Sequence, residues 1–232
     1  MTKITIFSGF LGAGKTTLIK KLIAEGYKNE KLVLIENEFG DIGIDGGFLQ
    51  DAGVEITEMN SGCICCSLVG DFGKNLHEVI DKYHPDRILI EPSGVGKLSD
   101  VMRAVEGATG EAGVHLNSAV AVVDAKKCKT YLKNFGEFFE NQIEHAGTII
   151  LSRTGEMSEE KINQCIGLIR QHNEKAAIIT TPWDELDGKK IMEAIDNDES
   201  FWEEQALKEN MTVEQLKRMR KTEAQNRQLV ES

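Results

Sequence analysis

The chain has 232 residues, of which 41% are hydrophobic and 28% are charged, an ordinary composition for a globular protein. Lys and Arg number 27 against 38 Asp and Glu, and the formal net charge of −11 argues against a general nucleic-acid binder, which needs excess cations to neutralise phosphates. Because no apolar run reaches the roughly 18 residues of a membrane span and the N-terminal segment does not resemble a signal peptide, we expect a cytoplasmic protein with no nucleic-acid or membrane partner.

Short apolar runs alternate with longer helical patterns along most of the chain. The predicted strands, rich in Ile and Val, are Ile4–Ser8, Leu32–Glu36, Arg87–Glu91, Ala119–Val123, Thr148–Leu151 and Ala176–Thr180, with a further candidate at Val54–Met59. The predicted helices are Lys15–Glu25, Asp71–Lys82, Asp100–Gly107, Phe135–His145, Glu159–Asn173 and Gly188–Ile195. This alternation predicts an α/β fold with a mainly parallel central sheet and helices on both faces.

The last part of the chain differs in composition. From residue 201 to the end there is no Gly or Pro, charge is dense, and Leu207, Met211 and Leu216 follow a weak helical spacing. We predict one domain over residues 1–200 and a charged helical tail over residues 201–232. The tail is either solvated and loosely packed or a helix that binds a partner or a second copy.

A glycine-rich segment follows the first predicted strand. Its sequence, GFLGAGKT from Gly9 to Thr16, matches G-x-x-x-x-G-K-[ST] between a strand and a helix. The glycines let successive backbone N–H groups point into one concavity, which attracts phosphate oxygens together with the helix N-terminus. The predicted nucleotide-binding residues here are Gly12, Ala13, Gly14, Lys15, Thr16 and Thr17. Lys15 would reach the β- and γ-phosphates, Thr16 would ligate Mg²⁺, and Thr17 would donate to the α-phosphate.

A carboxylate ends the apolar strand Arg87–Glu91. A carboxylate at the end of the strand beside such a loop holds Mg²⁺, directly or through water, so Glu91 is the predicted second magnesium ligand. Gly94 follows three residues later, where a glycine lets a backbone N–H approach the γ-phosphate. The alternative for Glu91 is an ordinary surface carboxylate at a strand end.

Three of the five cysteines, Cys63, Cys65 and Cys66, fall within four residues. In a reducing compartment this packing indicates metal or redox chemistry rather than a disulfide framework. Three thiolates suit Zn²⁺ or Cu(I), and also Co²⁺ or Ni²⁺. Small buried hydrophobic residues and a redox disulfide are the alternatives.

A complete tetrahedral site needs a further ligand. The acidic segment after the second strand is the natural supplier, with Glu36 and Asp41 as the candidates. The remaining cysteines, Cys128 and Cys165, lie in separate stretches and are expected to be packing residues.

Taken in order, GFLGAGKTT, ENEFGDIGIDG, GCICC and ILIEPSG resemble the CobW-type metallochaperone GTPases, relatives of the nickel-insertion GTPases HypB and UreG, over residues 1 to about 195. The resemblance implies a P-loop NTPase three-layer sandwich in which Glu91 is the Walker B acid and C-x-C-C binds metal. It also implies slow GTP hydrolysis coupled to metal delivery or to insertion of a metal or corrinoid cofactor. The partner would then be a metalloprotein or corrinoid-protein client, and the resemblance also allows a homodimer.

The sequence departs from that family in two places. The guanine-reading motif Asn-Lys-x-Asp corresponds here to SRTG, with Ser152 and Arg153 first and Gly155 in place of the Asp that bonds the guanine edge. Glu156 or Asp184 are candidates to replace it. We expect GTP, with ATP or relaxed specificity as the alternative. In addition, only the charged tail stands where many members carry a second domain.

Together these features predict a metal-responsive nucleotide switch. The segment from Glu36 to Asp45 would change order with the γ-phosphate, and metal affinity would change with it by linkage. Glu38 or Asp41 would position the attacking water, so the predicted catalytic residues are Lys15, Glu38, Asp41 and Glu91. The alternatives are an accessory ATPase or GTPase of a corrinoid-protein partner with structural cysteines, and a metal-storage or sensing protein with little turnover.

Overall fold

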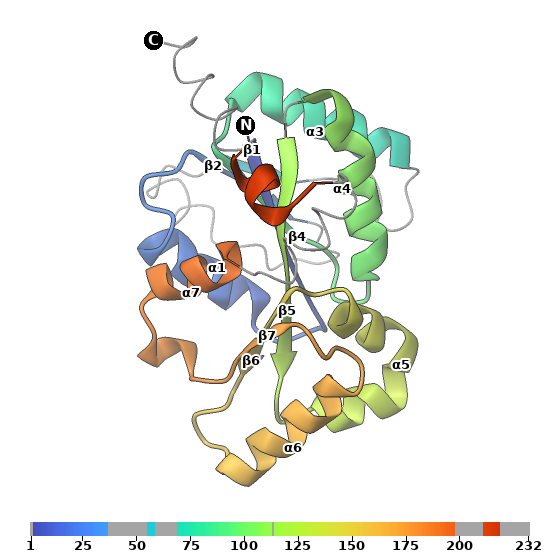
Figure 1. Cartoon of the computed structure of the whole chain (residues 1–232), viewed down its shortest axis with the longest axis vertical. Helices are drawn as coiled ribbons and strands as arrows, with labels where there is room; N and C mark the ends of the chain where they lie inside the picture. Colours follow the sequence, from blue (N-terminus) through green and yellow to red (C-terminus); the bar gives the residue numbers. More distant parts are fainter. Residues whose placement is uncertain (1, 37–54, 59–68, 113, 198–210, 219–232) are drawn as a thin grey trace.

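The computed structural model describes residues 2–36, 55–58, 69–112, 114–197 and 211–218 (Figure 1). Within these ranges seven strands form one sheet in the order β3-β2-β4-β1-β5-β6-β7, and every neighbouring pair is parallel. The strands are β1 (Thr2–Gly9), β2 (Leu32–Glu36), β3 (Glu55–Glu58), β4 (Arg87–Glu91), β5 (Val114–Asp124), β6 (Thr148–Ser152) and β7 (Ala177–Ile179). The predicted α/β class and parallel sheet are confirmed.

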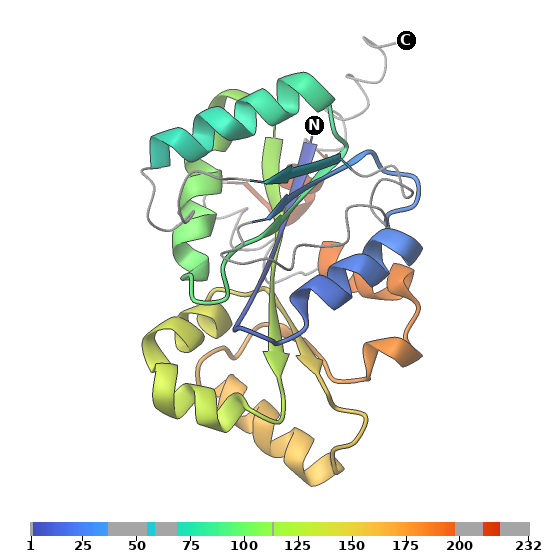
Figure 2. The ribbon, with the colours of Figure 1, turned by 180° about the vertical axis from the view of Figure 1, so that it is seen from behind.

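Helices cover both faces of this sheet (Figures 1 and 2). They are α1 (Lys15–Glu25), α3 (Val69–Tyr83), α4 (Leu98–Ala112), α5 (Cys128–Glu144), α6 (Glu159–Arg170) and α7 (Gly188–Asp196), with a short 3₁₀ helix η1 (Trp183–Glu185). One apolar core packs α1 and α7 against the sheet, and a second core packs α3, α4, α5 and α6 against the other face. Strands β2, β4, β5 and β6 are buried at every position, which explains their continuous apolar runs.

Helix boundaries differ from the prediction where local geometry interrupts the pattern. Helix α5 was expected from Phe135 but begins at Cys128, because Phe135 itself has non-helical angles (φ −133°, ψ 28°) that break the periodicity. Helix α6 ends at Arg170 rather than Asn173. The Asn173 amide donates to the carbonyls of Ile143 and Ala146 at 2.8 Å, and its Oδ1 accepts from a following backbone N–H, so this residue closes a loop instead of extending the helix.

A buried guanidinium joins α7 to the sheet. Arg87, the first residue of β4, is 0% exposed. Its Nε donates to Glu30 at 2.6 Å, its Nη1 and Nη2 donate to Asp196 at 3.0 and 2.6 Å, and its guanidinium lies 4.6 Å from the centre of the Tyr27 ring. Two carboxylates therefore compensate a charge that would otherwise be costly to bury.

Only residues 211–218 of the predicted tail are described. Residues 213–218 are helical, and Thr212 begins the helix with a capping box: its N–H donates to Gln215 Oε1 at 2.8 Å, and its Oγ1 accepts from the Gln215 N–H at 3.2 Å. Leu216 is completely buried. The division at residue 200 stays a prediction. Among the described helices, none combines the length and apolar character needed to cross a bilayer.

Candidate functional site

Parallel strands bring several predicted site residues to one edge of the sheet. The residues that end β1, β2, β4, β5 and β6 are Gly9, Glu36, Glu91, Asp124 and Ser152. Because all of these strands run in the same direction, their carboxyl ends lie together, and this is the edge at which α/β sheets bind ligands.

The glycine-rich loop leaves β1 at this edge and enters α1. Gly9 has φ +148°, and a Cβ there would lie 2.4 Å from the Val122 carbonyl oxygen, so only glycine fits beside β5. Gly14, at φ +101°, caps α1 in the left-handed conformation, which other residues rarely adopt. The N–H groups of the first helical turn have no intrahelical acceptor, so the loop and helix together present donors to an anion.

A hydroxyl, a carboxylate and an ammonium group meet where the loop joins the sheet. The Thr16 hydroxyl donates to Glu91 Oε1 at 3.0 Å, and Lys15 Nζ lies 3.9 Å from the same oxygen. Lys15 and Glu91 are 8% and 5% exposed. Hard oxygen donors of this kind are the ligands that Mg²⁺ takes. The two predicted magnesium ligands, Thr16 and Glu91, are thus adjacent in the structure although they lie far apart in the sequence.

The loop after β4 lies against the glycine-rich loop. A Cβ on Gly94 would be 2.8 Å from the backbone nitrogen of Leu11, so this approach requires glycine. Buried Gln142 of α5 donates through Nε2 to the carbonyls of Gly94 and Gly96 at 3.2 and 3.0 Å. Gln142 has no role predicted from the sequence, and it holds this loop in place.

Arg153 connects three elements at the other side of the glycine-rich loop. It follows β6 with φ +61°, and its Nε lies 3.1 Å from Oδ2 of the buried Asp124 at the end of β5. Its Nη2 donates to the Gly12 carbonyl at 3.0 Å. Ser152 is buried beside it, 3.4 Å from the Val123 carbonyl. Asp124 was missed as a site residue, although an apolar strand ending in a carboxylate is the same signal that identified Glu91.

The segment expected to read the base has few carboxylates available. Glu156 accepts from Lys126 at 2.7 Å, and this bond holds the pKa of the Glu156 carboxyl below its usual value. Gly155 faces the Pro182 side chain, and Trp183 of η1 lies against Gly14, where a Cβ would come within 2.9 Å of its ring. Trp183 therefore borders the glycine-rich loop, and Pro182 borders the segment expected to read the base. The sequence did not indicate either role.

Only one residue of the predicted transition-metal site lies in the described part of the chain. Cys63, Cys65, Cys66, Glu38 and Asp41 lie outside the described residues. Glu36 is described: it is 7% exposed, ends β2, and is the register partner of Glu91 in β4. In the described ranges no three His, Cys, Asp or Glu side chains are grouped to hold a metal ion.

Comparisons with known proteins identify the family to which most of the chain is related. The CobW/HypB/UreG nucleotide-binding domain matches residues 3–180. Zinc chaperone YeiR of Escherichia coli (strain K12) is 32% identical over 160 residues, which are 69% of this chain and 49% of that protein. Zinc-regulated GTPase metalloprotein activator 1 of Schizosaccharomyces pombe is 31% identical over 205 residues, 84% of this chain and 49% of that protein. The chain thus spans about half the length of these curated relatives.

Solved structures share the fold. The Zn(II)-bound YjiA GTPase from E. coli superposes with a TM-score of 0.63 at 21% identity, covering 85% of this chain and 61% of that one. The hydrogenase maturation factor HypB from Archaeoglobus fulgidus gives 0.60 at 16% identity, covering 82% and 86%. The three-layer arrangement is therefore the P-loop NTPase fold predicted from the sequence. With the family match over most of its length, the chain belongs to the CobW/HypB/UreG family and carries that family's nucleotide-binding domain.

Proposed function

We propose that this chain binds GTP with Mg²⁺ and hydrolyses it in response to a transition metal ion. The contact between the Thr16 hydroxyl and the Glu91 carboxylate, with Lys15 beside them, is the observation that carries this proposal. Thr16 and Glu91 would hold Mg²⁺, which supplies charge neutralisation of the phosphates. Lys15 would bind the β- and γ-phosphates, and the backbone from Gly12 to Thr17 would cradle the remaining oxygens.

The base would lie between the segment after β6 and the Pro182–Trp183 turn. Arg153 supports this position because its side chain contacts both Asp124 and the Gly12 carbonyl. It would thus connect the segment beside the base to the loop that binds the phosphates. We propose GTP as the substrate, since two relatives carry GTPase in their names. Gly155 has no carboxylate to bond the guanine edge, and the neighbouring Glu156 carboxylate is bonded to Lys126. The preference for GTP over ATP would therefore be modest.

Metal would act through Cys63, Cys65 and Cys66 together with Glu36 and Asp41. Zn²⁺ is the first candidate because relatives are named zinc chaperones, and Co²⁺ or Ni²⁺ would suit the same donors. The register of Glu36 with Glu91 supports coupling, since a ligand of each proposed metal ion then sits on adjacent strands. Glu38 or Asp41 would position water for slow hydrolysis.

GTP hydrolysis would drive the delivery of the bound metal ion to a client metalloprotein. One relative is named a metalloprotein activator, which supports a protein client. A corrinoid-dependent client and a homodimer are further expectations from the sequence. The cytoplasmic location and the charged tail after residue 200 also stay predictions.

Titration of Zn²⁺ with and without a non-hydrolysable GTP analogue tests the coupling. We expect different zinc affinities in the two states, and the nucleotide affinity must shift by the same factor when zinc is present. Lys15→Ala, which keeps the cysteines and removes the phosphate ligand, should abolish the difference. Equal zinc affinities in both states would reject the switch and favour a storage protein. Full activation of the client by the Cys66→Ser variant would favour the alternative in which the cysteines are structural and do not bind metal.

A further inference from the structure

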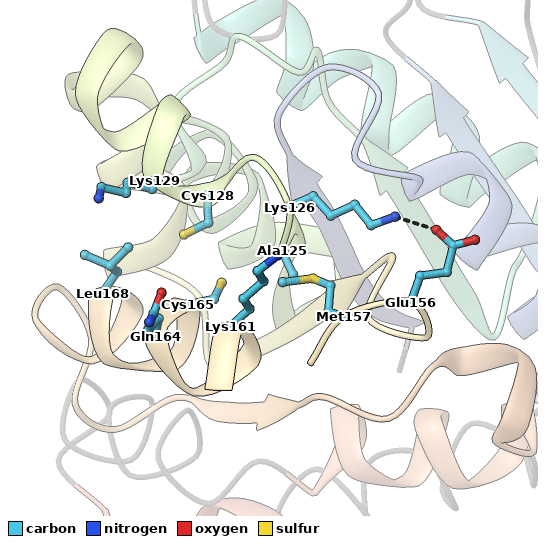
Figure 3. Close-up of a pocket in the computed structure, with 10 residues that line it drawn as sticks. All are labelled: Ala125, Lys126, Cys128, Lys129, Glu156, Met157, Lys161, Gln164, Cys165 and Leu168. Carbon is cyan, nitrogen blue, oxygen red and sulfur yellow. Dashed lines mark hydrogen bonds and ion pairs between the residues drawn. The ribbon is translucent and has the colours of Figure 1, made fainter. Parts of the chain in front are cut away.

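The two cysteines outside the cluster at residues 63–66 meet in the structure. Cys128 is the first residue of α5 and Cys165 lies in α6, and both line the same pocket. Both are free thiols. Figure 3 shows the two sulfur atoms facing one another from the two helices. Both belong to the apolar core, as expected of packing residues, and the structure adds that they lie together as a dithiol.

The dithiol lines a pocket of about 370 Å³ formed by the start of α5, by α6 and by the loop that precedes α6 (Figure 3). The Cys128 and Cys165 residues are only 1% and 3% exposed, so bulk solvent hardly meets them directly. A reagent must enter the pocket to reach either sulfur. This geometry selects small molecules and excludes a bulky thiol reagent.

Charged side chains line the pocket beside the dithiol. They are Lys126, Lys129, Lys161 and Glu156, of which Lys126 and Glu156 are paired with each other. Cys128 itself stands at the N-terminal end of α5, where the helix dipole favours an anion. The neighbouring Cys165 thiol lowers the pKa of the Cys128 thiol, against the opposing effects of burial and of the Asp124 carboxylate. The Cys128 thiol, together with burial, raises the pKa of Cys165. Of the two thiols, Cys128 is therefore the one that ionises first.

We propose that Cys128 and Cys165 form an oxidation site for small hydroperoxides, with Cys128 as the nucleophile and Cys165 as the resolving thiol. The Cys128 thiolate attacks a peroxide oxygen: an S–O bond forms, the O–O bond breaks, and hydroxide leaves. Cys165 then attacks the sulfenic sulfur of Cys128, the S–S bond forms, and the hydroxyl leaves as water with the proton from Cys165. Two thiols and one hydrogen peroxide give one disulfide and two waters.

Tryptic mapping of the full reduced chain tests this proposal. The protein is treated with one equivalent of hydrogen peroxide, alkylated, and digested without reductant. Cleavage after Lys127, Lys129, Lys161 and Arg170 releases Cys128 and Cys165 on separate peptides, 128–129 and 162–170. We expect these two peptides linked by a disulfide. The linkage should form at least about tenfold faster than in the guanidinium-unfolded chain, because the fold already holds the two thiols in one pocket and the chain between them need not be closed.

Variants separate the two roles. With Cys165→Ser the sulfenic acid should persist on Cys128 and be trapped by a 1,3-diketone, since serine cannot resolve it. Cys165→Ala should give the same trapped product, because it also lacks the resolving thiol. With Cys128→Ser, Cys165 should remain unmodified.

Three results would overturn the proposal. They are the absence of the linked peptides while Cys63, Cys65 and Cys66 oxidise, linkage at the same rate in the unfolded chain, and a disulfide from Cys128 or Cys165 to the cluster. The first two use the unmutated chain, so they remain decisive if a variant fails to fold.

Discussion

The Thr16 hydroxyl and the Glu91 carboxylate are 75 positions apart in the chain and 3.0 Å apart in the structure. Thr16 lies in the first turn of α1 and Glu91 ends β4, so the parallel pairing of β1 with β4 brings them together. Lys15 adds a charge 3.9 Å from the same carboxylate.

Removal of the Thr16 hydroxyl should weaken magnesium binding. We expect Thr16→Ala to lower the Mg²⁺ affinity of the nucleotide complex at least about tenfold, the usual effect of losing one group at a metal site. Thr16→Ser keeps the hydroxyl and is the matched control. Phosphate release measured against Mg²⁺ concentration checks this, and identical magnesium curves for the alanine and serine variants would contradict the assignment.

Gly155→Asp should restore a preference for guanine. A Cβ at this position meets only the Pro182 side chain, at 3.6 Å, so the larger residue fits without strain. We expect the ratio of GTP to ATP affinity to rise at least about tenfold, because an aspartate can accept from the guanine edge. Gly155→Ala controls for added bulk. If the aspartate and alanine variants have the same GTP to ATP ratio, the base does not lie at this loop.

Asp196→Ala should lower the free energy of unfolding of the domain. Asp196 pairs with Arg87 at the edge of the sheet opposite the nucleotide site. The substitution leaves the fully buried Arg87 charge with Glu30 as its remaining charged partner. Breaking a buried ion pair from one side costs about 3 kcal/mol or more of unfolding free energy. Urea unfolding of the full chain measures this. Glu137→Ala removes the exposed partner of Lys97 and should leave the urea midpoint unchanged. Equal midpoints for the two variants would show that the Arg87 network is not important for stability.

Tyr27 should make the domain sensitive to alkaline pH. Burial raises the pKa of its phenol in the folded state, although the Arg87 charge acts in the opposite direction. Above about pH 10 the unfolded phenol ionises while the folded one stays protonated, so stability falls as the pH rises, by up to about 1.4 kcal/mol per pH unit. Tyr27→Phe keeps the ring against Arg87 and removes this dependence. Parallel stability curves for the two proteins from pH 9 to 11 would contradict the prediction.

The local pattern of the chain was sufficient to predict the parallel sheet and the strand and helix on either side of the glycine-rich loop. The bounds of β5 were wrong, since it begins at Val114 rather than Ala119 and ends at Asp124 rather than Val123. Strand–helix alternation and G-x-x-x-x-G-K-[ST] depend on neighbouring residues, so they predicted β2, β4 and α1 at their observed bounds. The start of α5 was wrong because the kink at Phe135 disrupts the helical period. The roles of the cluster at residues 63–66, Glu38 and Asp41 stay predictions, since those residues lie outside the described part.

The sequence by itself determined the fold class and predicted the phosphate-binding residues, because both follow from short-range periodicity and from contiguous residues. Only the tertiary structure decided which distant groups meet. Parallel strand pairing set Thr16 against Glu91, strand ends set Arg153 between Asp124 and Gly12, and the packing of α5 on α6 put Cys128 and Cys165 in one pocket. These contacts link residues far apart in the chain, and their partners are chosen by the packing of whole elements rather than by any local pattern.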